Sequence, residues 1–98
     1  DPRAAAEGAD VLVTDSWSSM GRARDVDPLQ RQAIFQPYQL NDALLALAAP
    51  DCLVQHCLPA QKGQEITRAV FERHAGQIFD EAENRLHVQK AILAMLME

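Results

Sequence analysis

Short apolar runs alternate with longer amphipathic segments along this chain of 98 residues. Residues 11–14 (VLVT) and 52–58 (CLVQHCL) are continuous apolar or β-branched runs, typical of strands buried on both faces of a parallel sheet. Residues 77–80 (QIFD) predict a third, weaker strand. Polar residues follow each run, so each predicted strand is expected to end in a loop.

Capping residues predict where the helices between these strands begin. Asp27 precedes Pro28, and Asp caps free N–H groups while Pro fits the first helical position. Asn41 and Thr67 predict two more helix starts, and apolar residues at 40, 44, 47 and 48 extend the helix after Asn41 towards residue 49. The remaining predicted helices are 2–8, which ends at Gly8, and 81–97.

The resulting order of elements predicts an α/β fold, because strands alternate with helices along the chain. We expect part of a doubly wound, three-layer, Rossmann-like domain with a parallel sheet of about three strands. Three strands are few for such a sheet and would leave a bare edge. The chain also begins with Asp1 rather than Met. Both features predict a fragment of a longer protein.

Composition excludes several classes of function. The chain is 48% hydrophobic and 23% charged, with a net charge of −5. A protein that binds nucleic acid needs a basic patch, so no nucleic-acid partner is expected. A membrane span needs about 20 consecutive apolar residues, and the N-terminus lacks a signal segment. No membrane partner is therefore expected.

The two cysteines indicate a reducing compartment. Cys52 and Cys57 are five residues apart in one predicted strand, so their side chains lie on opposite faces and a mutual disulfide is disfavoured. A cytoplasmic location is expected. A zinc site that includes His56 is also disfavoured, because the spacing is not C-x-x-C and a fourth ligand is missing.

Polar clusters lie at or near the carboxyl ends of the three predicted strands, at residues 15–21, 56–59 and 80–85. Ligands of open α/β sheets bind outside the carboxyl ends of the strands, so these clusters are expected to converge on one site.

Each cluster also has a purely structural interpretation. Asp15 could bond the backbone of its own loop, and Ser19 could cap a helix. His56 could fill the core beside a buried thiol. Arg85 could pair with Glu81 one helical turn away.

Together, four segments resemble motifs of the ornithine carbamoyltransferase family, in the family's order. Residues 15–21 (DSWSSMG) are similar to its D-x-W-x-S-M-G loop, and 35–41 (FQPYQLN) to its F-x-P-Y-Q-[VL]-N segment. Residues 56–60 match H-C-L-P-A, followed by Gly63 and Glu65, and 80–87 (DEAENRLH) match D-[EQ]-A-E-N-R-[LM]-H. The resemblance covers essentially all 98 residues. The departures, at 22–24 and 61–62, touch no ligand position of the family.

The same motifs separate this chain from close relatives of the family. Aspartate carbamoyltransferases have Pro where this chain has Cys57. Putrescine and acetylornithine carbamoyltransferases share H-C-L-P but need no contact to a free α-amino group. Asp15, Ser19 and Met20 therefore favour ornithine as the substrate.

The resemblance implies transfer of a carbamoyl group from carbamoyl phosphate to the δ-amine of L-ornithine, giving L-citrulline and phosphate without a metal or redox cofactor. Asp15, Ser19 and Met20 would bind ornithine. Cys57 would be the catalytic residue that accepts the proton of the amine. An unperturbed thiol has a pKa of about 8.5, and no cation that would lower it is evident in the sequence.

The resemblance also assigns the contacts of carbamoyl phosphate, which are Cys57, Leu58 and Arg85. The Leu58 carbonyl would accept a bond from the carbamoyl amide, aimed by a cis Leu58–Pro59 peptide bond. Arg85 would bind the oxygen on which charge develops. His56 and Pro59 would support the loop.

Within the family, residues 1–98 correspond to the C-terminal portion of the ornithine-binding domain. The N-terminal carbamoyl phosphate-binding domain, with its S-T-R-T and H-P-x-Q motifs, is absent, as is the Asn that holds the ornithine carboxylate. These residues alone are expected to be inactive, whereas the parent is expected to be a homotrimer of arginine biosynthesis.

The alternative is a non-catalytic domain that only associates with other chains. The final helix favours self-association of the fragment, because its apolar residues form two stripes where one would suffice. These residues are Leu86, Val88, Ile92, Leu93, Met95, Leu96 and Met97.

Overall fold

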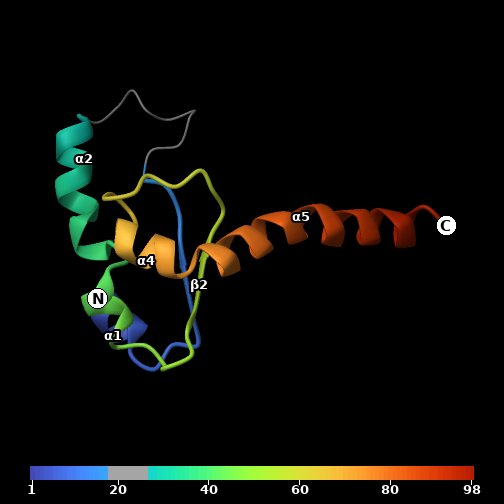
Figure 1. Cartoon of the computed structure of the whole chain (residues 1–98). Coiled ribbons are helices and arrows are strands. Elements are labelled where there is room, and N and C mark those ends of the chain that lie inside the picture. Colours follow the sequence, from blue (N-terminus) through green and yellow to red (C-terminus); the bar gives the residue numbers. More distant parts are fainter. Residues whose placement is uncertain (18–26) are drawn as a thin grey trace.

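Two parallel strands and the helices around them form the fold of residues 1–17 and 27–98, which the computed structural model describes. The α/β fold class is confirmed. Figure 1 shows the two strands side by side and the C-terminal helix projecting away from the rest of the molecule. The elements are α1 (Pro2–Ala6), β1 (Val11–Thr14), α2 (Pro28–Phe35), the 3-10 helix η1 (Gln36–Tyr38), α3 (Asp42–Leu45), β2 (Leu53–His56), α4 (Arg68–Arg73) and α5 (Ala75–Leu96).

The sheet has one covered face and one exposed face. Val11 lies opposite Leu53 and Thr14 opposite His56, so both strands end at the same level. Side chains alternate between the faces: Val54 and His56 are fully buried, whereas Val13 is 69% exposed. The expectation that the strands are buried on both faces is therefore wrong for the described residues, because these residues cover only one face.

The hydrophobic core lies on the covered face. Its side chains come from β2, α4, the first turn of α5 and the segments before α3 and α4. Burial of one large aliphatic or aromatic side chain stabilises the folded state by about 1.5–3 kcal/mol. A bridge between Leu40 and Ile66 joins the segment before α3 to the segment before α4. The core residues are Leu40, Val54, Ile66, Val70, Phe71 and Ile78.

The predicted capping residues are confirmed, although the helices after two of the predicted starts are short. The side chains of Asp27, Asn41 and Thr67 accept hydrogen bonds from backbone N–H groups of the first turns of α2, α3 and α4. After α3 the chain continues in tighter turns, in which the Leu47 N–H donates to the Leu44 carbonyl. The helix predicted to extend towards residue 49 therefore ends at Leu45, and residues 46–48 form turns instead.

The third strand predicted at 77–80 is wrong, because these residues lie in α5, which begins at Ala75 rather than at residue 81. The pattern of only four residues cannot distinguish a short strand from a helical segment that buries a single residue. In the helix, Ile78 is fully buried. The Gln77 side chain accepts a hydrogen bond from the Val54 N–H at 3.1 Å. A helix thus occupies the edge of β2 where the third strand was expected.

Among the described residues, no helix combines the length and the apolar character that crossing a membrane requires.

Candidate active site

The carboxyl ends of β1 and β2 bring Asp15 and Cys57 together. Because Thr14 lies opposite His56, the residue after each strand emerges at the same place. The Cys57 thiol donates a hydrogen bond to Asp15 Oδ1 at 2.9 Å. Asp15 Oδ1 also accepts the N–H of Ser16 at 2.6 Å, so the bond to its own loop is present as well. Asp15 and Cys57, one residue from each of the first two clusters, therefore converge as expected.

Hydrogen bonding between these side chains changes the proton affinity of both. The thiol bond and the Ser16 N–H lower the pKa of Asp15. The same bond, burial and the Asp15 charge raise the pKa of Cys57, while the Arg85 charge acts in the opposite direction. Cys57 is therefore a neutral thiol near pH 7, and Asp15 is an anion.

The pH range of this pair follows from the two directions. Asp15 has a lowered pKa in the folded state, so its contribution to stability is present above its unfolded pKa and is lost as the pH falls. Cys57 has a raised pKa, so its contribution is present below its unfolded pKa and is lost as the pH rises through the folded value. The bond between them persists across the neutral range.

Behind Cys57 the chain reverses sharply. β2 ends at His56 rather than at Leu58, because Leu58 has a φ of 57°, outside the range of a strand. The Leu58–Pro59 peptide bond is cis. The expected cis bond is confirmed. Leu58 is half-buried against the core.

A buried hydrogen-bonded pair holds this loop from inside. The Leu58 N–H donates to His56 Nδ1 at 2.7 Å, so that nitrogen carries the lone pair and Nε2 carries the proton. Nε2 then donates to Glu65 Oε1 at 2.7 Å, and both side chains are fully buried. Glu65 Oε1 also accepts the N–H of Gln61 at 2.7 Å. His56 is thus hydrogen-bonded on both sides of its ring, which fixes one tautomer and ties Leu58 to Glu65.

The side chain of Gln39 holds the segment that carries Glu65 through a pair of hydrogen bonds, which we call the Gln39 clamp. The buried Gln39 side chain donates to the carbonyls of Gly63 at 3.1 Å and Gln64 at 2.8 Å. The Leu40 N–H donates to the Glu65 carbonyl at 2.9 Å. Residues 35–41 matched a family motif without a structural role, and this clamp supplies one.

Replacing Gln39 by Leu is expected to destabilise the chain by about 1–3 kcal/mol, because two carbonyls lose their buried donor. Urea unfolding measures the change. Gln30→Leu is the matched control, since Gln30 is exposed on α2 and should change stability by less than about 0.5 kcal/mol. Equal effects of the two substitutions would contradict the clamp.

Arg85 lies on α5, where it is exposed, and its charge acts on Cys57. The alternative interpretation of Arg85, a pair with Glu81, does not hold, because Glu81 Oε2 instead accepts the His56 N–H at 3.1 Å. The predicted ligand residues Ser19 and Met20 lie outside the described residues. The described residues thus bring Asp15, Cys57 and Leu58 to one place, with Arg85 near enough to influence the thiol.

The sequence did not single out Glu65, Gln39 or Glu81 as working parts of this site. Glu65 and Gln39 were visible only as polar members of motifs. Burial turns both into structural hydrogen-bonding groups, and burial is not readable from motif spacing.

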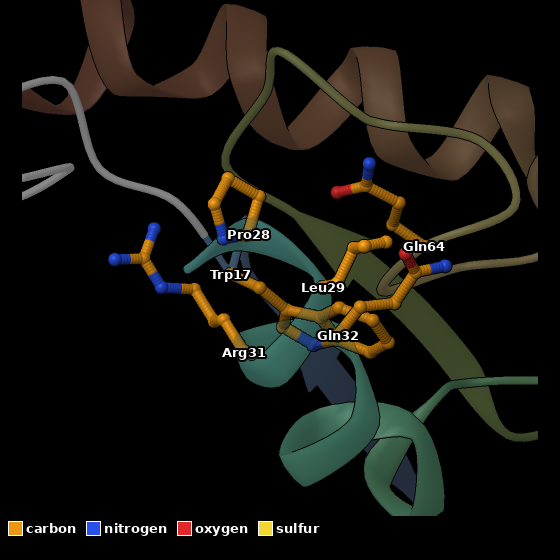
Figure 2. A pocket seen from close by; sticks show the side chains of 6 residues that line it. All are labelled: Trp17, Pro28, Leu29, Arg31, Gln32 and Gln64. Atoms are coloured by element: carbon orange, nitrogen blue, oxygen red, sulfur yellow. The ribbon is translucent and has the colours of Figure 1, made fainter. Parts of the chain in front are cut away.

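A small cavity of about 130 Å³ lies beside Trp17 (Figure 2). The Trp17 ring stacks on Phe35, with ring centres 5.8 Å apart, and so ties the loop after β1 to α2. The cavity does not include Asp15, Cys57 or Arg85. Its lining residues are Trp17, Pro28, Leu29, Arg31, Gln32 and Gln64.

Comparison with known proteins identifies the origin of this arrangement. The family model described as aspartate/ornithine carbamoyltransferase, Asp/Orn binding domain, matches residues 1–96. The ornithine carbamoyltransferase of Geobacter sulfurreducens is 55% identical over 98 residues, which are 100% of this chain and 32% of that protein. The chain thus spans about a third of the length of this relative.

Solved structures agree with the sequence comparison. The anabolic ornithine carbamoyltransferase of Campylobacter jejuni superposes with a TM-score of 0.91 at 38% identity, over 98% of this chain and 31% of that one. An N-acetyl-L-ornithine transcarbamylase superposes with a TM-score of 0.73 at 34% identity, over 98% and 29%. The chain belongs to the aspartate/ornithine carbamoyltransferase family, whose Asp/Orn-binding domain its residues 1–96 match.

Proposed function

We propose that residues 1–98 supply the ornithine side of an ornithine carbamoyltransferase, as the C-terminal portion of its ornithine-binding domain. The observation that carries this proposal is the bond of 2.9 Å between Cys57 and Asp15 at the ends of two parallel strands. It joins an anion that can bind an ammonium group to a thiol that can exchange a proton. The same proposal makes the parent protein a cytoplasmic enzyme of arginine biosynthesis that forms homotrimers.

Asp15 binds the α-ammonium group of ornithine, with Ser19 and Met20 as further contacts. Its lowered pKa keeps it charged across the neutral range. A bond from an ammonium group to Asp15 competes with the bond from Cys57. Loss of that bond removes the main cause of the raised thiol pKa. Ornithine binding therefore favours the thiolate of Cys57, which forms when the thiol proton passes to solvent and which can then accept a proton from the reacting δ-amine.

Leu58 and Arg85 act on the carbamoyl phosphate, together with Cys57. The turn at Leu58 and Pro59 directs the Leu58 carbonyl to the carbamoyl amide, and the buried His56–Glu65 pair keeps this turn fixed. Arg85 places a permanent positive charge where the carbonyl oxygen becomes negative. Attack by the amine then needs mainly a fixed geometry, which this loop provides.

An exchange chimera tests the proposal. Residues 1–98 would replace the matching 98 residues of the Geobacter sulfurreducens ornithine carbamoyltransferase, which are 55% identical. The chimera is expected to form citrulline from ornithine and carbamoyl phosphate. Aspartate, putrescine and N-acetylornithine serve as competing acceptors. A folded chimera that carbamoylates one of these in preference to ornithine would assign the chain to that related transferase instead.

A second function, association without catalysis, is favoured by the exposed apolar side of α5. Leu93, Met95 and Leu96 are 57%, 78% and 77% exposed, and a large apolar patch favours association. We expect residues 1–98 to self-associate through α5 in equilibrium sedimentation, and Leu93→Lys to weaken this association. Gln89→Lys adds the same charge at an exposed polar position of the helix and is the control. A clean monomer would contradict the prediction, and an oligomer that Leu93→Lys leaves intact would place the contact elsewhere.

A further inference from the structure

One row of side chains on α5 lies along the edge of β2. Gln77, Glu81 and Arg85 are four residues apart and share a face of the helix. Gln77 Oε1 accepts the Val54 N–H, and Glu81 Oε2 accepts the His56 N–H, each at 3.1 Å. Val54 and His56 are two residues apart in β2, so both N–H groups point to the edge that is not paired with β1.

The spacing of the helix matches the spacing of the strand. Four helical residues rise by about 6.0 Å, and two strand residues rise by about 6.6 Å. One step along the row on α5 therefore corresponds to one step between these N–H groups. Arg85 is the next residue of this row, one helical turn beyond Glu81, and its charge acts on Cys57, the residue that follows His56.

Arg85 itself has no fixed partner within the described ranges 1–17 and 27–98. Its side chain is exposed, and its effect on Cys57 is an effect of charge. Its position relative to the loop therefore depends on where α5 sits against β2. The hydrogen bond that the His56 N–H donates to Glu81 is well placed to set this position, because His56 is also bonded to Glu65 and to Leu58.

We propose that Gln77 and Glu81 are positioning residues that fix the register of α5 on β2 and so hold Arg85 at the Cys57–Leu58 loop. This inference rests on the proposed function, in which Arg85 binds carbamoyl phosphate. The two bonds take the place of a neighbouring strand, because side chains from a helix satisfy the N–H groups of the strand edge. Their loss lets α5 shift along or away from β2.

Thiol titration of Cys57 in the whole 98-residue chain tests the positioning. With Cys52→Ala, Cys57 is the only thiol, and the pH dependence of its alkylation reports its pKa. Arg85→Gln is expected to raise this pKa in the chain that carries only Cys52→Ala. The same rise is expected when Glu81→Gln is also present, because glutamine keeps an oxygen acceptor. Together with Glu81→Ala, which removes the acceptor, the effect of Arg85→Gln is expected to disappear. An unchanged effect of Arg85→Gln in the Glu81→Ala background would overturn the proposal.

Amide hydrogen exchange tests the two bonds separately. Glu81→Ala is expected to speed exchange of the His56 amide by about tenfold or more and to leave the Val54 amide protected. Gln77→Ala is expected to do the reverse, and it replaces Glu81→Ala if circular dichroism shows that the latter does not fold. Unchanged protection of both amides would also overturn the proposal. Both measurements are independent of transferase activity, so an inactive chimera would count against the proposed function and not against this register.

Discussion

Residues 1–98, produced by themselves, are expected to form no citrulline from ornithine and carbamoyl phosphate. The chain spans about a third of its relatives, 32% of the Geobacter sulfurreducens protein. Its sequence contains neither S-T-R-T nor H-P-x-Q, the motifs that are expected to bind carbamoyl phosphate. One arginine on a projecting helix cannot replace a phosphate site, since stabilising the transferred group requires several fixed donors.

A colorimetric citrulline assay on the purified chain measures this directly, with the exchange chimera as the positive control. The expected difference is complete: turnover by the chimera and only the uncatalysed background for residues 1–98. Turnover above background by the purified 98-residue chain would contradict the proposal that these residues supply only the ornithine side of the site.

Glu65→Ala is expected to remove about 2–6 kcal/mol of stability, because two buried donors left without an acceptor cost about 1–3 kcal/mol each. This is a large part of the stability of a small domain. The substitution leaves the His56 Nε2–H and the Gln61 N–H without their acceptor in a fully buried place. The ring of His56 then loses its fixed orientation, and with it the bond from Leu58. Glu65→Gln keeps an oxygen acceptor and is expected to cost much less.

Urea unfolding of the unsubstituted chain, Glu65→Ala and Glu65→Gln measures these differences. Glu72→Ala is the control, because Glu72 is exposed on α4 and its removal should change stability by less than about 0.5 kcal/mol. If Glu65→Ala were no more destabilising than Glu72→Ala, the buried pair would not be what holds the loop.

The convergence of Asp15 and Cys57 could be predicted from the sequence because it depends only on strand direction. Two apolar runs separated by helices predict parallel strands, and the residues after parallel strands meet at one edge. The start of each helix was equally accessible, since capping by Asp27, Asn41 and Thr67 is a local interaction.

Other features could not be predicted because they depend on distant contacts. Residues 77–80 have an ambiguous pattern, and only the position of β2 decides that Gln77 serves its edge from a helix. The role of Glu65 depends on burial of His56 nine residues earlier in the chain. Helical spacing offers Glu81 as an alternative partner for Arg85, but the backbone N–H of His56 binds that carboxylate instead.

The most direct test of the central claim is the binding of each substrate to the exchange chimera with and without Asp15→Asn. If Asp15 binds the ammonium group of ornithine, loss of this charge-assisted bond should weaken ornithine by roughly 10- to 150-fold, which corresponds to about 1.5–3 kcal/mol. Carbamoyl phosphate affinity should stay nearly unchanged. Asp51→Asn, at the opposite end of β2, is the control and should change neither. Equal weakening of both substrates by Asp15→Asn, or of neither, would contradict the assignment of this chain to the ornithine side of the reaction.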